Sequence, residues 1–398
     1  MVFFGRLAAV AAVLAPAVLG APTSPHPKIL NPLAADVVAD SYIVVYHPNI
    51  TSDGIASHVE SVSSILSKRS SASGVGQTYN LPQLKGYQVT ADSSAIAQIA
   101  DSPEVAYIEK DAKVYASGLT TQADATWGLG RISHQETDST DYIYDTTAGS
   151  GATVYVVDTG IYIGHEEFGG RAKWGANYVS GSENTDENGH GTHCSGTIGG
   201  STYGVAKKVS LVAVKVLNKN GQGQNSGVIS GIQYVHDNAG SNSVLSMSLG
   251  GGKSSAINSA VASTVDAGVT VVVAAGNDDE DASNSSPASE PSAITVGAID
   301  DTDARASFSN YGKLVDVFAP GVDVLSSWIG STDATNTISG TSMATPHVAG
   351  LAAYLIILDG LSSPADVVSR ITSLAISGDI SDAGSGSPNL IAYNGNGA

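Results

Sequence analysis

The chain of 398 residues is longer than one average domain, which indicates a large globular core with a smaller unit beside it. Apolar residues make up 42% and charged residues 14%, a balance that excludes an intrinsically disordered chain. The 45 glycines follow no three-residue period, which excludes a collagen. A formal net charge of −19 argues against nucleic acid and anionic membrane surfaces as partners.

The N-terminus has the pattern of a secretory signal peptide over residues 1–20. Arg6 precedes the apolar run 7–19, and small residues follow it, as at a signal-peptide cleavage site. The alternative is a membrane anchor, but the run is shorter than the roughly 20 residues that span a bilayer, and Pro16 interrupts it. We therefore expect export through the secretory pathway, either to the extracellular medium or to a vacuole.

A proline-rich stretch at 21–32 is predicted to be a disordered joint before a small folded unit. Beyond it, apolar residues recur at strand and helix spacing up to residue 114. The order strand-helix-strand-helix-strand is typical of an α+β unit with its helices on one face of a sheet. The predicted strands are 42–46, 84–90 and 105–114, and the predicted helices are 51–68 and 93–100.

Residues 118–124 are polar and turn-rich and are predicted to be a linker to a second, larger unit. From residue 126 onward, mostly apolar runs alternate with helical patterns, which is typical of buried parallel strands covered on both faces. The pattern predicts a doubly wound α/β domain. Its predicted strands are 153–157, 211–216, 244–249, 270–275 and 294–296, and its predicted helices are 227–236, 256–266, 345–358 and 364–374.

Two short segments of the larger unit carry an acid and a histidine in suggestive positions. Asp158 ends an apolar strand just before a glycine turn, although an acid there can simply stabilise the turn. His190 lies between two glycines, so we expect its ring to be approachable from solvent, and His193 to be a structural histidine held by a hydrogen bond. The two histidines lack the four-residue spacing and the glutamate of a zincin, which disfavours a zinc site.

Ser342 lies among small residues where a long apolar helix begins, so its backbone N–H is at the positive end of the helix dipole. Alone, this serine could be a helix cap. Together with Asp158 and His190 it completes a set in which histidine removes the proton of the serine and the carboxylate orients the histidine. Asn277 follows an apolar strand, and its amide could donate to an oxyanion beside the Ser342 N–H, unless it is only a turn asparagine.

The segments 157–160, 190–193, 275–277 and 340–350, in this order, resemble those of the subtilisin family of serine peptidases (S8). The proteinase K branch and fungal secreted alkaline proteases are most similar. The resemblance covers residue 126 to the C-terminus. It implies a three-layer α/β/α fold with a mostly parallel sheet and a monomeric endopeptidase that hydrolyses proteins and peptides through an acyl-enzyme. It also implies broad specificity, with apolar or aromatic P1 residues preferred, and no cofactor for catalysis.

Residues 41–115 resemble the inhibitory propeptide of the same family, an inhibitor I9-type domain with a ferredoxin-like fold. The resemblance implies that the chain is an autoprocessed zymogen whose own propeptide, 21–117, assists folding and acts as an intramolecular inhibitor. We expect the cut near residues 116–118, which would leave 118–398 as the mature peptidase domain.

The resemblance also implies substrate-binding residues. Ser248, Leu249 and Gly250 would form an edge strand that pairs with the substrate backbone. Gly221 and Gly223 would belong to the opposite edge strand. The S1 pocket would be walled by those first three residues together with Ala274, Ala275 and Gly276. Relatives usually have a tyrosine where this chain has Asn225, which leaves the S4 preference open.

A structural Ca²⁺ is implied by the resemblance, with the carbonyls of Pro291 and Ala293 and the carboxylate of Asp316 as ligands. The alternative is that Asp316 is solvated or forms a salt bridge. Cys194 is the single cysteine, so no intrachain disulfide can form, and Ile294 stands where the branch has a disulfide cysteine. We expect Cys194 to be a buried, inert thiol, although mercurials that reached it could disturb the neighbouring histidine.

Two N-x-[ST] sequons, at Asn49 and Asn284, predict N-glycosylation, although either asparagine could remain unmodified. Two other functions compete with a peptidase. An esterase or lipase would need a Gly-x-Ser-x-Gly elbow followed by an acid and a histidine, and Ala344 replaces its last glycine. A non-catalytic scaffold is disfavoured because no member of the triad is missing.

Overall fold

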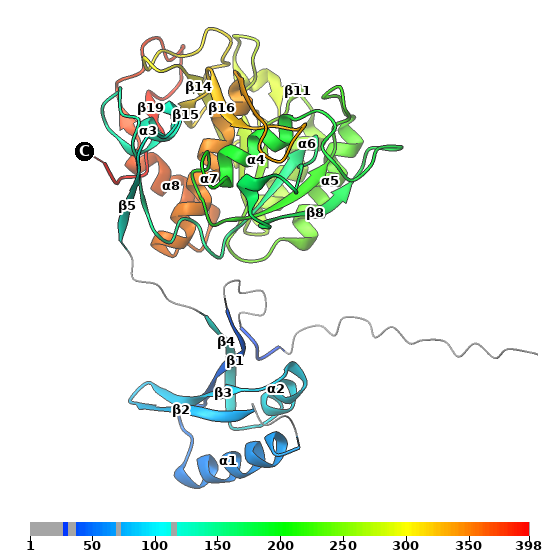
Figure 1. The fold of residues 1–398 in the computed structure, drawn as a ribbon, viewed down its shortest axis with the longest axis vertical. Coiled ribbons are helices and arrows are strands. Elements are labelled where there is room, and N and C mark those ends of the chain that lie inside the picture. The colour runs from blue at the N-terminus through cyan, green and yellow to red at the C-terminus, as the bar shows by residue number, and fades with distance from the viewer. Residues whose placement is uncertain (1–26, 31–36, 69–72, 113–117, 398) are drawn as a thin grey trace, which may run out of the picture. The chain divides into compact units, whose positions relative to one another are not determined.

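The computed structural model describes residues 27–30, 37–68, 73–112 and 118–397 (Figure 1). The predicted signal peptide 1–20, most of the predicted joint 21–32 and residues 116–117 of the predicted processing stretch lie outside the described residues. The chain divides into two compact units, with the boundary between Asp111 and Ala112. Each unit is described by itself.

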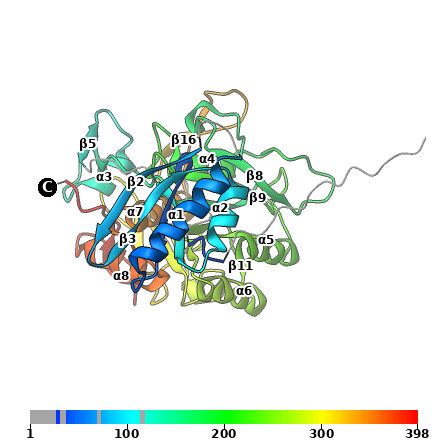
Figure 2. The ribbon, with the colours of Figure 1, turned by 90° about the horizontal axis from the view of Figure 1, so that it is seen from below.

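The N-terminal unit is a four-stranded sheet in the order β2-β3-β1-β4, with both helices over one face (Figure 2). This arrangement confirms the predicted α+β, ferredoxin-like class. Its hydrophobic core joins Val44 of the sheet to Val62 and Ile96 of the two helices. The elements in chain order are β1 (Val37–Tyr46), α1 (Ser52–Leu66), β2 (Gly74–Leu81), β3 (Leu84–Thr90), α2 (Ser93–Ala100) and β4 (Val105–Ala112).

One strand of this unit, β2, was missing from the prediction. Its residues are mostly exposed, so they show no alternation of apolar and polar side chains. The strand exists because it pairs antiparallel with β3 in a hairpin whose turn joins Leu81 to Leu84. A β-bulge between Val75 and Thr78 shifts its register further.

The C-terminal unit is built on a nine-stranded sheet in the order β18-β19-β15-β14-β12-β10-β7-β9-β8. All neighbouring pairs are parallel except β18 with β19. The strands of this sheet are β7 (Thr153–Asp158), β8 (Ala172–Asn177), β9 (Ser210–Lys215), β10 (Ser243–Met247), β12 (Thr270–Ala274), β14 (Ile294–Ile299), β15 (Val317–Pro320), β18 (Ile376–Ser377) and β19 (Leu390–Ile391).

Helices cover both faces of this sheet, which confirms the predicted three-layer α/β/α class. One hydrophobic core joins the sheet to α4, α7 and α8, and a second core joins its other face to α5 and α6. The helices are α3 (Trp127–Ser133), α4 (His190–Gly199), α5 (Asn225–Asn238), α6 (Ser255–Asp266), α7 (Thr341–Asp359) and α8 (Pro364–Leu374). Two short 3-10 helices are η1 (Glu166–Phe168) and η2 (Ala282–Asn284).

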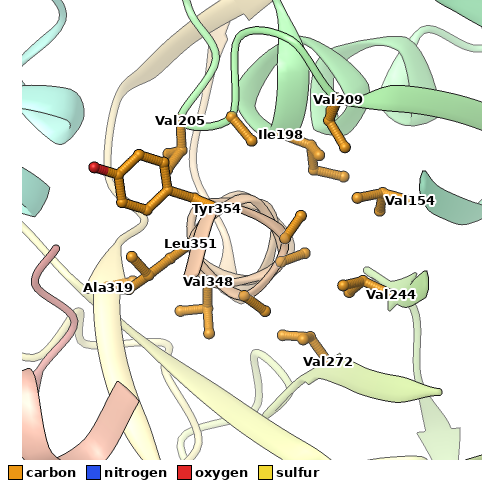
Figure 3. Close-up of a cluster of buried hydrophobic side chains, with 14 of the residues drawn as sticks. Val154, Ile198, Val205, Val209, Val244, Val272, Ala319, Val348, Leu351 and Tyr354 are labelled. Carbon is orange, nitrogen blue, oxygen red and sulfur yellow. The ribbon is translucent and has the colours of Figure 1, made fainter. Parts of the chain in front are cut away.

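Helix α7 runs through the middle of the first core, so it is apolar on all sides. Figure 3 shows Val348, Leu351 and Tyr354 on the helix, with Val154 and Val244 of the sheet on another side of it. Among the described helices it alone is long and apolar enough to cross a membrane, but 83% of its most apolar stretch is buried inside the protein. Its composition is therefore that of a core helix.

The prediction that residues 118–124 are a linker without regular structure is wrong for the middle of this segment. Residues Leu119–Gln122 form β5, which pairs antiparallel with β6 (Tyr142–Asp145). The strand is half-exposed and polar, so its pairing depends on a partner about twenty residues away that a local pattern does not reveal. Two further small ladders were not predicted either: β11 (Gly251–Gly252) with β13 (Ser285–Ser286), and β16 (Val324–Ser327) with β17 (Thr335–Ile338).

The strand order of the large sheet reverses between β7 and β10. From β7 the chain builds outward to β9 and β8 on one side and to β10, β12, β14 and β15 on the other. In open α/β sheets, ligands bind beyond the carboxyl ends of the strands at such a switch point. Strands β7 and β10 end at Asp158 and Met247, so we expect a ligand-binding site beside these two residues and those that follow them.

Candidate active site

Asp158 and His190 form the centre of the site. Asp158 is fully buried at the end of β7, and its Oδ1 accepts a hydrogen bond from the Thr159 backbone N–H at 2.6 Å. His190 is the first residue of α4, and its Nδ1 lies 2.8 Å from Asp158 Oδ1 and 3.0 Å from Oδ2. With Nδ1 donating to the carboxylate, Nε2 carries the free lone pair and can accept a proton.

The glycines on either side of His190 have a packing role that was not predicted. Gly189 has a φ of 106°, and a Cβ there would lie 2.5 Å from the Trp328 ring. A Cβ on Gly191 would lie 2.2 Å from the Gly160 carbonyl. These glycines therefore allow close packing of the Asp158 and His190 turns, while the His190 side chain stays 24% exposed, as expected of a ring that solvent can approach.

The protonation of His190 is set by its surroundings. Burial lowers its pKa, but the Asp158 carboxylate and the neighbouring Cys194 together hold the pKa well above the ordinary value for histidine. The Cys194 thiol lies 3.9 Å from His190 Nδ1. Because burial raises the pKa of this thiol, it is uncharged near neutrality, and Asp158 supplies the charge that stabilises the imidazolium.

His193 is buried, and its Nε2 donates a hydrogen bond to the Val324 carbonyl, 2.9 Å away. Burial lowers its pKa to about 4, so it is neutral in the working enzyme. Its contacts agree with a structural role.

Ser342 is the second residue of α7, where backbone N–H groups have no partner within the helix. Its hydroxyl donates to the Ser248 carbonyl at 3.2 Å, and no hydrogen bond joins it to His190 among the described residues. Cys194 lies between the two residues, with Sγ 3.4 Å from the Ser342 carbonyl. Catalytic hydrogen bonds are often loose before substrate binds, so this geometry is compatible with transfer of the serine proton to His190.

Asn277 lies beside Ser342 with its amide orientation fixed. Its Oδ1 accepts hydrogen bonds from the backbone N–H and the hydroxyl of Thr341, at 2.8 and 2.9 Å. Because the oxygen is occupied in this way, Nδ2 is left to donate into the adjoining cavity, which Asn277 and Ser342 both line. The site therefore offers two donors to an anionic oxygen, the Ser342 N–H and the Asn277 amide.

A cavity of about 310 Å³ opens beside Ser342 where an S1 pocket was predicted. Leu249, Gly250, Ala274 and Gly276 line it. Ala275 was also predicted to line the pocket. Its side chain is instead fully buried in a hydrophobic cluster, so this side chain forms no part of the pocket wall. The cavity also contains two acids that were not predicted, Asp278 and Glu280.

A second cavity of about 390 Å³ lies next to His190, between the two segments predicted as substrate-binding edges. It is lined by Ser248, Leu249 and Gly250 on one side and by Gly221, Gly223 and Asn225 on the other, over an apolar floor of Leu217, Val228 and Ile257. Neither segment is a strand. Residues 248–250 continue past the end of β10, and 221–223 belong to a turn closed by hydrogen bonds between Asn218 and Gln222.

The remaining predicted residues are the calcium ligands and the two sequon asparagines, and one of these lines the cavity beside Ser342. Asp316 precedes β15, and its Oδ2 accepts the Thr295 N–H at 2.8 Å. Burial raises the pKa of Asp316 to about 6, against a smaller lowering effect of that hydrogen bond. Asn49 is exposed in the N-terminal unit, whereas Asn284, also exposed, lines the same cavity as Ser342.

A buried carboxylate is hydrogen-bonded to a half-buried histidine, and Cys194 contacts both this histidine and a serine at a helix N-terminus. At the switch point of a parallel sheet, this arrangement defines a serine hydrolase of subtilisin architecture. Residues 149–391 match the Subtilase family (peptidase S8), and residues 41–117 match Peptidase inhibitor I9. The chain belongs to the subtilase family.

Proteins of similar sequence that are named as proteases agree with this assignment. Subtilisin-like protease 2 of Pseudogymnoascus destructans is 63% identical, with all of both chains covered. Alkaline protease 1 of Emericella nidulans is 49% identical over 98% of each chain, and the cuticle-degrading serine protease of Arthrobotrys oligospora is 50% identical over 93% of this chain and 94% of the relative. A crystal structure of a cold-adapted subtilisin-like serine proteinase matches with 46% identity and a TM-score of 0.66, covering 68% of this chain and 99% of that one. The protein is therefore a subtilisin-like serine protease with an I9 propeptide, made as a zymogen.

Proposed function

We propose that the mature protein is a secreted endopeptidase of broad specificity, with Ser342 as nucleophile, His190 as general base, Asp158 as the orienting carboxylate and Asn277 as an oxyanion donor. The observation that carries the proposal is the 2.8 Å contact between His190 Nδ1 and the buried Asp158, next to a serine at a helix N-terminus. The serine esterase and scaffold alternatives lack a comparable supporting observation.

The reaction follows from these positions. His190 Nε2 removes the hydroxyl proton as Ser342 Oγ attacks the peptide carbonyl carbon. The carbonyl oxygen becomes anionic and receives hydrogen bonds from the Ser342 N–H and the Asn277 amide. The imidazolium, stabilised by Asp158, then protonates the leaving amine, and an acyl-enzyme remains. Water repeats the sequence with the same base and releases the acid.

Substrate binding is proposed to use the backbone of residues 248–250 and 221–223, which line opposite sides of the cavity next to His190. An extended peptide between them would add hydrogen bonds of the sheet type. The small walls Ala274 and Gly276 suit a large apolar or aromatic P1 side chain. Asp278 and Glu280 give this cavity a negative charge, so we propose that lysine and arginine are also accepted at P1. With Asn225 in place of a tyrosine, the S4 side is bounded by a small polar residue.

Maturation is proposed to follow the family pattern: removal of a signal peptide 1–20, then self-cleavage near residues 116–118 to release the propeptide 21–117 from the peptidase domain 118–398. Strand β5 begins at Leu119 and is anchored on β6, so a cut before it would leave the catalytic unit intact. The mature enzyme is proposed to be a monomer outside the cell; delivery to a vacuole is the alternative.

A structural Ca²⁺ held by Asp316 and the carbonyls of Pro291 and Ala293 is also proposed. The carboxylate of Asp316 is partly buried, and no lysine or arginine forms a salt bridge with it in the described part of the chain. A buried carboxylate without a counter-charge is unfavourable, and a cation bound by oxygen ligands would relieve this cost. N-glycosylation at Asn49 and Asn284 is supported by their exposure.

The proposed function is tested by expressing the full precursor and Ser342→Ala side by side. Wild-type protein should process itself, hydrolyse casein and react with a fluorophosphonate probe that labels activated serines. The Ser342→Ala precursor should do none of these. Ester hydrolysis without casein cleavage would favour the esterase, and absence of labelling in processed wild-type protein would favour the scaffold.

A further inference from the structure

Asp186 is a buried carboxylate that the sequence analysis did not single out. It lies four residues before His190, in the loop that leads into α4, and its exposed fraction is 4%. Five hydrogen bonds end on it. Oδ1 accepts from the Thr159 hydroxyl (2.8 Å), the Asn188 N–H (3.0 Å) and the Gly189 N–H (2.9 Å), and Oδ2 accepts from the Thr192 N–H (2.9 Å) and hydroxyl (2.6 Å).

These donors belong to the two turns that carry the catalytic pair. Thr159 directly follows Asp158, and Gly189 and Thr192 lie on either side of His190 in sequence. The Thr159 hydroxyl also accepts the Gly191 N–H at 2.9 Å. One carboxylate and one hydroxyl therefore connect the end of β7 to the first turn of α4, directly behind the Asp158–His190 contact.

A buried lysine supports the same connection from the sheet. Lys215 is the register partner of Asp158 on the neighbouring strand β9 and is fully buried. Its ammonium group donates to the Thr159 carbonyl at 2.6 Å and to the Leu217 carbonyl at 2.9 Å. Its Nζ lies 3.7 Å from Glu187, and its positive charge offsets part of the negative charge that Asp158 and Asp186 bring into the interior.

We propose that Asp186 is a positioning residue for peptide hydrolysis, which acts through the Thr159 hydroxyl to hold the Asp158 carboxylate against His190 Nδ1. This inference rests on the proposed function of the site. Asp186 touches neither substrate nor the reacting atoms. Its effect on rate comes from geometry: a displacement of about 1 Å in a catalytic group can cost on the order of 10²-fold in rate.

The isosteric change Asp186→Asn places an NH₂ group where one of the acceptor oxygens was, facing backbone N–H donors. The change Thr159→Val removes the hydroxyl and keeps the side-chain shape. Both should loosen the Asp158–His190 contact. Thr159→Ser keeps the hydroxyl and should restore the activity that Thr159→Val loses. A matched control is Asp300→Asn, since Asp300 accepts three hydrogen bonds from Thr302 and Ala304 in a turn outside the site.

The experiment measures kcat and KM for a chromogenic peptide amide over a range of pH, on processed enzymes whose active sites are counted with a fluorophosphonate. For Asp186→Asn and Thr159→Val we expect kcat to fall about tenfold or more while KM changes less than about threefold. The double variant should lose less than the product of the two single losses, because both changes break one connection. Asp300→Asn should keep the wild-type kcat per active site.

The pH profile separates positioning from a merely structural role. His190 is faced by Asp158 from β7 and by Cys194 and His193 from its own helix. If Asp158 is held less firmly, it stabilises the imidazolium less, so the acidic limb of kcat/KM should move to lower pH in Asp186→Asn and Thr159→Val. A loss of folded protein alone would reduce the number of labelled sites and leave both that limb and kcat per site unchanged.

Wild-type kcat per site and an unmoved acidic limb in Asp186→Asn would overturn the inference. If the Asp186→Asn precursor is not secreted, the comparison of Thr159→Val with Thr159→Ser tests the inference instead, by kcat per active site and by the position of the acidic limb. Failure of the proposed function is a different result, because wild-type enzyme would then be no more active on casein than Ser342→Ala.

Discussion

The side-chain oxygen of Asn277 is held by both donors of Thr341, the backbone N–H at 2.8 Å and the hydroxyl at 2.9 Å. The amide is therefore oriented before substrate arrives, with its NH₂ group directed to the cavity that Ser342 lines. Thr341 is also the first residue of α7, so the same turn of chain orients Asn277 and presents the Ser342 N–H. Both proposed oxyanion donors therefore depend on one helix terminus.

Loss of the amide should affect the chemical step. We expect Asn277→Ala to lower kcat by about 10²–10³ with little change in KM, which is the range known for this donor in a subtilisin. Thr341→Val keeps the backbone donor and removes only the hydroxyl, so its effect should be several-fold and smaller. Steady-state kinetics on a peptide amide checks both. A large rise in KM with unchanged kcat would instead place Asn277 in ground-state binding.

The pH dependence of activity should follow His190. Burial lowers the pKa of His190, but Asp158 and Cys194 together raise it to well above its ordinary value. The base must be neutral to accept a proton, so kcat/KM should be low in acid and rise only at pH values above the usual range for histidine. Asp158→Asn should reduce kcat by about 10⁴ and shift the remaining limb to lower pH. An acidic limb unchanged in that variant would contradict the coupling.

Calcium removal should destabilise the enzyme in a pH-dependent way. The folded-state pKa of Asp316 without a cation is about 6, above its ordinary value near 3.8. A carboxyl with a raised folded pKa contributes stability below pH 4 that is lost as pH rises through 6, and this difference corresponds to about 3 kcal/mol. With the ion bound, that loss should disappear.

This prediction is checked by thermal unfolding of fluorophosphonate-inhibited enzyme, with calcium and with a chelator, between pH 4 and 8. The gap in Tm should widen as pH rises. Asp316→Asn should unfold at the same temperature with and without calcium. A chelator effect that persists in Asp316→Asn would place the ion elsewhere.

The acids of the cavity beside Ser342 should influence the P1 preference. Asp278 and Glu280 line this cavity with Ala274 and Gly276. We expect Glu280→Gln to reduce kcat/KM for P1 lysine by a few-fold relative to P1 phenylalanine, and the difference to shrink at high salt, because exposed charges are screened. Peptide amides that differ only at P1 provide the comparison. Asp382→Asn, which changes an exposed acid beside Arg305, is the charge-matched control.

Much of the catalytic arrangement followed from residue types in order along the chain. Four residues could be singled out because each stands next to the end of a predicted element. Asp158, Asn277 and Ser342 follow or begin apolar runs, and His190 lies between glycines. The prediction did not include the packing role of those glycines, because only the contacts with Trp328 and Gly160 show why a side chain is excluded there.

The sequence by itself determined the family, the layer order and the identity of the four residues proposed for catalysis, because these depend on local periodicity and on motifs that sit at strand and helix ends. The tertiary structure decided what depends on partners distant in the chain. It shows that part of the predicted linker is the strand β5 and that two acids line the cavity beside Ser342. It also shows that a hydrogen bond between Thr159 and Asp186, which are 27 residues apart, connects the turns of Asp158 and His190. A hydrogen bond over that separation exists only once the sheet has set its register.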